Sequence, residues 1–121
     1  MKLLVLDAGH CLNLALARLA HRRSDTELVI RPGLNIDAAL LREVAPAAVI
    51  IPPLSAPMEI EPAAVVAHGE GVDACLAACR ETDTPLVWCV SDQLYQDGFE
   101  TPIDEHVIPA PRDESLRRLI A

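Results

Sequence analysis

Apolar residues are concentrated in short runs that are spaced along the whole chain. Runs of mainly apolar residues lie at residues 2–6, 47–51 and 86–90, and a shorter one lies at residues 27–30. Unbroken apolar runs of this length are typical of strands that are buried on both faces of a sheet. The pattern therefore predicts four strands.

The segments between these runs have helical spacing. Leucines and alanines recur between residues 12 and 20, and Asn35 or Asp37 is placed to cap a helix that runs to about Val44. Residues 63–82 form the longest predicted helix, although its first half contains two glycines, which weaken a helix. Pro111 is suited to open a final helix, with acidic residues in its first turn and arginines near its end.

Strands that alternate with helices predict a parallel sheet with right-handed crossovers. We therefore expect a three-layer α/β fold, Rossmann-like, with a short parallel sheet of about four strands and a single domain over residues 1–121. Loops are predicted at residues 7–11, at the proline-rich residues 52–62 and at residues 91–110. All three follow strands, so they line the carboxyl edge of the sheet, where such folds bind ligands.

Composition and charge exclude several classes of protein. Hydrophobic residues make up 51% of the 121 residues, enough for one domain with its own core. The formal net charge of -8 repels phosphate backbones and anionic lipid headgroups, so we expect neither a nucleic-acid partner nor a membrane partner. Lys2 is the only lysine, which excludes a P-loop lysine, a Schiff-base lysine and a Tyr-x-x-x-Lys pair.

The four cysteines are interpreted as reduced thiols. Cys11, Cys75, Cys79 and Cys89 stand in apolar surroundings and lack the close spacing of a disulfide scaffold. No apolar run reaches the length of a membrane span, and the first run is too short for a signal peptide. We therefore expect a cytoplasmic protein.

Several segments, in order and at suitable spacing, carry a family likeness. They are residues 1–6 (MKLLVL), 40–51 (LLREVAPAAVII), 72–79 (VDACLAAC), 90–98 (VSDQLYQDG), 101–105 (TPIDE) and 109–111 (PAP). Together they resemble the first strand, the helix and strand pairs, and the S-T-D-Y-V-F-D-G, P-Y-x-E and x-P-x-N motifs of the dTDP-4-dehydrorhamnose reductases. These reductases are sugar nucleotide-binding, extended short-chain dehydrogenases. The resemblance implies an NAD(P)-binding Rossmann-like domain.

The glycine-rich turn of that family is degenerate in this sequence. The resemblance places Asp7, His10 and Asn13 where the family has three glycines, and Gly9 is the only glycine left in the turn. A carboxylate would repel the pyrophosphate, and side chains at the other two positions block its close approach to the backbone. We therefore expect no bound cofactor and only a vestigial NAD(P) site, whose remaining residues are Gly9, His10, Cys11, Arg31 and Ser91.

The catalytic groups of the family are also missing. The resemblance places the active-site hydroxyl at Ser91, or at Val90 with a shift of one residue, whereas the tyrosine of the family falls near Ser115 and its lysine near Leu119. The family also continues into a substrate domain that has no counterpart in these residues. The sequence is thus interpreted as a degenerate, truncated member. Whether it is an enzyme stays open, and the absence of both the Tyr-x-x-x-Lys pair and the glycine-rich turn favours a protein that is not an enzyme.

Other chemical readings of single residues have simpler alternatives. Cys75 and Cys79 with His68 could supply three metal ligands, but cysteines usually behave as small buried residues, which is the preferred interpretation. The Asp7, His10 and Cys11 group could form a nucleophile pair or an acidic site, and a structural turn is preferred.

Three positions near strand ends have the same two interpretations. Ser91 and Asp92 either hold a ligand or cap a turn, and capping is preferred. Arg31 either holds a cofactor 2′-phosphate or is solvated, and solvation is preferred. Trp88 is interpreted as a core or interface residue.

Two functions remain open from the sequence. The preferred one is a non-catalytic relative of the reductases, a pseudoenzyme that acts as a binding or regulatory module through protein contacts. The alternative is a sugar-nucleotide or NAD(P)-binding oxidoreductase subunit that completes its site with another chain. Because no later strand is evident beside residues 86–90, we also expect a homodimer, formed through residues 63–82 and 111–121 and burying Cys75 and Leu116.

Overall fold

The computed structural model describes residues 1–7, 11–53 and 62–90, which contain four strands and three helices. In chain order these are β1 (Lys2–Val5), α1 (Cys11–His21), β2 (Glu27–Ile30), α2 (Ala38–Val44), β3 (Ala48–Ile51), α3 (Pro62–Glu81) and β4 (Leu86–Trp88). The alternation predicted from the apolar runs is confirmed throughout these ranges.

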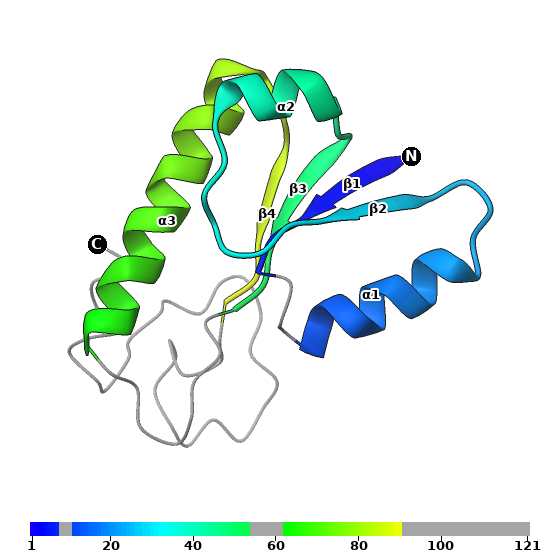
Figure 1. Ribbon diagram of the computed structural model, residues 1–121, viewed down its shortest axis with the longest axis horizontal. Coiled ribbons are helices and arrows are strands. Elements are labelled where there is room, and N and C mark those ends of the chain that lie inside the picture. Colours follow the sequence, from blue (N-terminus) through cyan, green and yellow to red (C-terminus); the bar gives the residue numbers. More distant parts are fainter. Residues whose placement is uncertain (8–10, 54–61, 91–121) are drawn as a thin grey trace, which may run out of the picture.

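The four strands form one parallel sheet in the order β2-β1-β3-β4. The chain passes from β1 to β2 in one direction and then crosses back over β1 to β3. Right-handed crossovers in opposite directions place their helices on opposite faces of a sheet. Accordingly α1 lies on one side of the sheet, while α2 and α3 lie together on the other (Figure 1). The three-layer α/β fold expected from the sequence is confirmed.

The core lies between the sheet and the α2–α3 layer. Alternate residues of β1 and β3 face this layer and are fully buried, and the facing side of α3 contributes apolar residues and two thiols. The buried cluster comprises Leu4, Leu6, Ile36, Leu41, Val49, Ile51, Val72, Cys75, Ala78 and Cys79. A fully buried leucine or isoleucine contributes about 1.5–3 kcal/mol, so this one layer supplies most of the apolar burial in the described residues.

Local capping fixes both ends of α2. The Asp37 carboxylate accepts a hydrogen bond of 2.8 Å from the Leu40 amide, which confirms the second of the two predicted caps. At the other end Ala45 adopts a left-handed conformation and its amide donates to the Leu41 carbonyl over 2.8 Å. Asp37 therefore sets where the helix begins and Ala45 where it ends.

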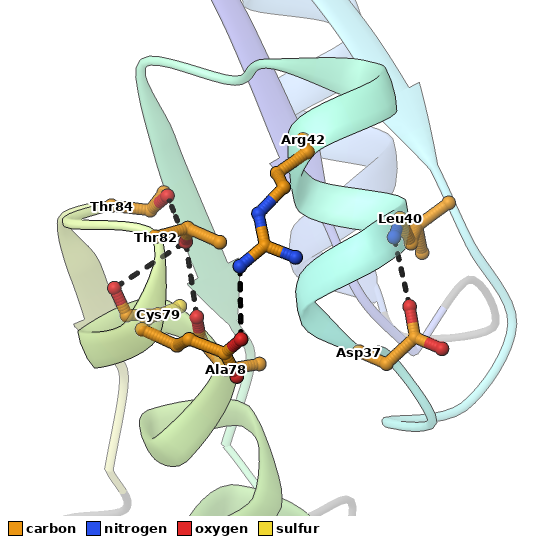
Figure 2. A network of polar contacts seen from close by, with 8 residues as sticks. Asp37, Leu40, Arg42, Ala78, Cys79, Thr82 and Thr84 are labelled. Atoms are coloured by element: carbon orange, nitrogen blue, oxygen red, sulfur yellow. Dashed lines mark hydrogen bonds and ion pairs between the residues drawn. The ribbon is translucent and has the colours of Figure 1, made fainter.

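A polar network joins the C-terminal ends of α2 and α3 (Figure 2). Arg42 of α2 forms an ion pair of 2.9 Å with Glu81 of α3, and both side chains are exposed. The Thr82 hydroxyl donates to the Ala78 carbonyl over 3.0 Å and contacts the Thr84 hydroxyl at 2.7 Å. Exposed ion pairs contribute about 0–1 kcal/mol, so the hydroxyl contacts at the end of α3 are the more specific feature.

Gly71 lies where α3 approaches the loop before α2. A Cβ atom at this position would lie 2.9 Å from Leu34 Cδ1 and 3.0 Å from Leu34 Cβ. The helix continues through Gly71 without interruption. The glycine that the sequence suggests as a weak point thus permits a close contact between the helix and the loop.

Some sequence predictions lie outside the described residues: the loop at residues 91–110, the helix from Pro111, and most of the proline-rich loop at residues 54–61. The predicted contact between two copies is wrong in one respect, because Cys75 is already completely buried in the core of its own chain. Among the described helices none is long and apolar enough to cross a membrane.

Candidate functional site

The order of the strands marks one position on the sheet edge. The chain leaves β1 toward β2 on one side and later returns to β3 on the other side, so the direction of winding reverses between β1 and β3. In open parallel sheets ligands bind at such a reversal, in the crevice outside the carboxyl ends of the two strands. Residues that follow β1 and β3 are therefore the first candidates for a site.

Asp7 follows β1 and has the backbone conformation of a glycine. Its φ of 56° lies in the left-handed region, which glycine adopts freely and aspartate adopts at a modest cost. Its amide donates to the Gly33 carbonyl over 3.0 Å, which ties Asp7 to the loop that follows β2. Asp7 therefore has the left-handed backbone that a glycine adopts freely while carrying a carboxylate.

Asn13 lies in the first turn of α1 and reaches back to the end of β1. Its Nδ2 donates to the Leu6 carbonyl over 3.0 Å and to the Asp7 carbonyl over 2.6 Å. The residue is only 2% exposed, and its Oδ1 has no hydrogen-bond partner among the described residues. Leaving a buried acceptor unpaired costs about 1–3 kcal/mol, so this oxygen requires an explanation.

Pro52 explains why the Leu6 carbonyl needs a donor from outside the sheet. The Leu6 amide donates to the Ile50 carbonyl, and in a parallel ladder the Leu6 carbonyl would then accept from the amide of residue 52. Proline has no amide hydrogen, and Pro52 is fully buried at this position. Asn13 therefore replaces the donor that Pro52 removes.

His68 and Trp88 approach the same edge from α3 and β4. His68 is 7% exposed, and its ring centroid lies 6.5 Å from that of Trp88 at an interplanar angle of 40°. Burial lowers the pKa of His68, and the nearby Asp7 carboxylate partly offsets this by raising it. The imidazole is therefore neutral at neutral pH and lies within electrostatic range of the carboxyl end of β1.

Only some of the residues predicted for the vestigial cofactor site belong to the described part of the chain. Gly9, His10 and Ser91 lie outside the described residues, and Cys11 is described only as the first residue of α1. Arg31 follows β2, is exposed, and uses its amide to donate to the Val5 carbonyl over 2.9 Å. The interpretation of Arg31 as a solvated side chain is consistent with this exposure.

The two cysteines of α3 do not face the sheet edge. Cys75 and Cys79 are buried in the core, as the preferred interpretation of their spacing predicts. The Cys75 thiol donates to the Leu34 carbonyl over 3.1 Å, and burial raises its pKa to about 11. No group of three His, Cys, Asp or Glu side chains within residues 1–7, 11–53 and 62–90 is arranged to hold a metal ion.

Sequence reasoning missed the roles of Asn13 and Pro52. It treated the first only as an obstacle to a cofactor and the second only as the end of a strand. The available signal was a polar amide in the first turn of an otherwise apolar helix, together with a proline at the last buried position of a strand. Neither signal is interpretable without the register that brings residues 6, 13 and 52 together.

Comparison with solved structures finds the same fold in proteins described as dTDP-4-dehydrorhamnose reductases and as a UDP-glucose 4-epimerase. A hypothetical dTDP-4-dehydrorhamnose reductase from Sulfolobus tokodaii superposes with a TM-score of 0.70 at 20% identity, over 99% of this chain and 50% of that one. A dTDP-4-dehydrorhamnose reductase from Clostridium acetobutylicum superposes with a TM-score of 0.78 at 16% identity, over 99% of this chain and 46% of that one. A UDP-glucose 4-epimerase from Brucella ovis in complex with NAD superposes with a TM-score of 0.74 at 22% identity, over 98% of this chain and 44% of that one. The chain has the fold of these enzymes.

The fold expected from the resemblance to dTDP-4-dehydrorhamnose reductases is thereby confirmed. The chain spans about half the length of each of these proteins. No family model and no curated protein sequence matches the chain. The relationship therefore rests on the course of the backbone, and what the site does must be argued from its own residues.

Proposed function

We propose that this chain is a binding module built on the dTDP-4-dehydrorhamnose reductase fold, without the cofactor or the catalysis of a reductase. The observation that carries the proposal is the first turn after β1, where Asp7 and Asn13 stand in place of glycines. In dinucleotide-binding Rossmann folds, glycines in this turn let the pyrophosphate approach the backbone and the helix N-terminus.

Each replacement opposes a dinucleotide for a different physical reason. The Asp7 carboxylate carries the same charge as a pyrophosphate and is partly exposed at the carboxyl end of β1. The Asn13 side chain fills the space between α1 and β1 and uses its amide hydrogens on two backbone carbonyls. A bound pyrophosphate would meet charge repulsion at the first position and a buried side chain at the second.

The position of the only lysine supports the absence of catalysis. Lys2 is the first residue of β1, so it lies at the amino end of the sheet. At about 3.3 Å per residue it is roughly 16 Å from the carboxyl edge. A lysine at that end of the strand cannot lower the pKa of a tyrosine at the opposite edge, which is the role that the reductase mechanism would require.

The alternative remains an oxidoreductase subunit that completes a sugar-nucleotide or NAD(P) site with another chain. The sheet edge at β1 and β3 is the part of such a site that this chain would supply. The partner would then have to supply both the lysine and the groups that bind phosphate. This second function differs from the first in that the assembled complex, but not the isolated chain, would bind a dinucleotide.

Thermal unfolding in the presence of NADH and of NADPH tests the proposal. A ligand at one hundred times its dissociation constant adds about 2.7 kcal/mol to the free energy of unfolding. We expect no saturable rise in Tm with either cofactor and no turnover of a nucleotide-linked 4-keto sugar. A saturable rise of several degrees with the isolated chain would refute the proposal, and a rise seen only with a copurifying partner would favour the alternative.

A gain-of-function variant makes this test sharper. The double variant Asp7→Gly and Asn13→Gly restores two of the three glycine positions of the turn. If the two side chains exclude the dinucleotide, this variant should show a larger cofactor-dependent rise in Tm than the parent, provided that circular dichroism shows it folded. Asp83→Gly is a matched control, because Asp83 also has a positive φ, of 52°, but lies after α3.

A further inference from the structure

The outer face of α1 combines apolar and basic side chains. It consists of Leu14, Ala15, Arg18, Leu19 and Arg22, which are all exposed and fall within about half of the helix circumference. Leu14 and Leu19 are each 58% exposed. A surface helix normally directs charged and polar residues outward and keeps its leucines on the side that faces the core. The two leucines on the outer face of α1 depart from that pattern.

None of the described helices covers this face. α2 and α3 lie on the other side of the sheet (Figure 1), and the main contact of α1 with a described element is the one with β2. The five residues of the outer face all belong to the described part of the chain and are exposed there. The face is therefore accessible to a partner over about two helical turns, from Leu14 to Arg22.

The charge on this part of the chain is unbalanced. No acidic residue occurs between Asp7 and Asp25 in the sequence, whereas this stretch contains three arginines. Arg23 pairs with Asp25 over 3.2 Å, but Arg18 and Arg22 form no ion pair with any described residue. Like charges four residues apart on a helix repel each other. Because the whole chain has a formal net charge of -8, this positive charge is local to α1, and acidic groups of a partner would neutralise it.

We propose that the outer face of α1 binds a helix of another protein that presents apolar and acidic residues together on one side. The proposal rests on the proposed function, because it names the chemistry of the partner that the binding module takes. Leu14, Arg18 and Arg22 lie four residues apart and form one ridge, beside a second ridge of Ala15 and Leu19. Ridges of this spacing pack into the grooves of a second helix. Acidic residues of that helix would pair with the arginines while its apolar residues cover the leucines.

Charge disfavours the two other occupants of such a face. A second copy that packs through the same face would place arginines opposite arginines, and like charges across an interface are unfavourable. An anionic membrane would extend well beyond α1 and would be repelled by the net charge of -8 on the whole chain. A single acidic helix contacts only the arginines, because charges more than about 8 Å away are largely screened at physiological ionic strength.

Binding of a designed peptide tests the proposal. The probe is a fluorescein-labelled peptide of about 20 residues, long enough to be helical in isolation, with leucine and glutamate on one side and alanine and glutamine elsewhere. We expect a saturable rise in its fluorescence anisotropy with the wild-type chain, which weakens as sodium chloride is added. The counterpart peptide, with lysine in place of each glutamate, should not bind.

Two matched pairs of variants assign the binding to α1. Arg18→Glu and Arg80→Glu each reverse one exposed arginine in the last turn of a helix, α1 and α3 respectively, and change the net charge equally. We expect the first to weaken peptide binding by about fivefold and the second to leave it unchanged. Leu19→Ser should weaken binding by about tenfold, whereas Val66→Ser, at an exposed residue of α3, should not. Circular dichroism checks that each variant is folded.

Several outcomes would overturn the proposal. The wild-type chain would bind neither peptide, or both equally, or the two arginine variants would weaken binding to the same extent. Binding to phosphatidylglycerol vesicles in place of the acidic peptide would assign the face to a membrane surface, and self-association that Arg18→Glu abolishes in sedimentation equilibrium would assign it to a second copy. NADH binding by the isolated chain would refute the proposed function itself, whereas silence toward both NADH and the acidic peptide would refute only the partner site.

Discussion

Asn13 and Pro52 should be energetically coupled, although they belong to different elements. The Leu6 carbonyl lacks its ladder donor because residue 52 is proline, and Asn13 Nδ2 supplies a donor over 3.0 Å instead. Asn13→Ala removes this bond and the one of 2.6 Å to Asp7. Two net hydrogen bonds are worth about 1–3 kcal/mol, and the loss is offset in part because the unpaired Oδ1 is removed as well. We expect the free energy of unfolding to fall by about 1–2 kcal/mol.

The second substitution tests the mechanism of that loss. Pro52→Ala restores an amide hydrogen that faces the Leu6 carbonyl, so it should reduce the cost of Asn13→Ala. On its own Pro52→Ala should be mildly destabilising. Proline lowers the conformational entropy of the unfolded chain, which raises the free energy of unfolding by about 0.4–1 kcal/mol, and alanine loses this contribution. In the double variant we expect a coupling energy of about 1 kcal/mol, within the range measured for residues that share a partner.

Urea unfolding of the four proteins, followed by circular dichroism, measures this coupling. Pro53→Ala is the control, since the amide of residue 53 would face β4 and not the Leu6 carbonyl. It should show additive behaviour with Asn13→Ala. If Pro52→Ala and Asn13→Ala were additive to within about 0.5 kcal/mol, Asn13 would not be the substitute donor and the account of this turn would be wrong.

Three further outcomes follow from the described contacts. Burial lowers the pKa of His68 in the folded chain from its ordinary value of 6.5. The free energy of unfolding should therefore fall as the pH drops below 6.5 and on through the lower pKa of the folded state. Urea melts at several pH values should show a smaller fall for His68→Gln. Gly71→Ala should destabilise the wild type through contact with Leu34 and should cost less in a Leu34→Ala background, which removes the Cδ1 at 2.9 Å but keeps the Cβ at 3.0 Å, as thermal melts would record. Self-association through the edge of β4 that no described strand pairs with, where Val87 is 50% exposed, should weaken in Val87→Lys but not in Ile30→Lys on the β2 edge, measured by sedimentation equilibrium.

The sequence predicted the elements well because their signals are local. Buried parallel strands are short apolar runs, and the double proline at residues 52–53 ends one of them wherever it lies in space. Asp37 was recognisable as a cap from its place before an apolar helix, and the contact it makes depends only on residues 37–40. Each of these features is decided within a few residues, so a pattern read along the chain is sufficient.

The chemistry of the edge could not be predicted in the same way, because it depends on tertiary register. Whether the Leu6 carbonyl lacks a donor follows from its being opposite residue 52, and that is a property of the pairing between β1 and β3. The place of His68 beside Trp88 follows from β4 being next to β3. Likewise the reason for a glycine at position 71 is its close contact with Leu34, which is 37 residues earlier in the chain.

Asp7 and Asn13 both contribute to the stability of the chain end that follows β1. Asp7 retains the left-handed backbone that a glycine would supply, and Asn13 restores a hydrogen bond that Pro52 takes away. A glycine at position 13 would leave the Leu6 carbonyl unpaired, so Asn13→Gly alone should cost stability as Asn13→Ala does, with an added cost in helix propensity of about 1 kcal/mol. Stability of the fold and access for a pyrophosphate therefore make opposite demands on this residue. The contacts of the described residues satisfy the first demand, because Asn13 Nδ2 donates to both the Leu6 and the Asp7 carbonyl.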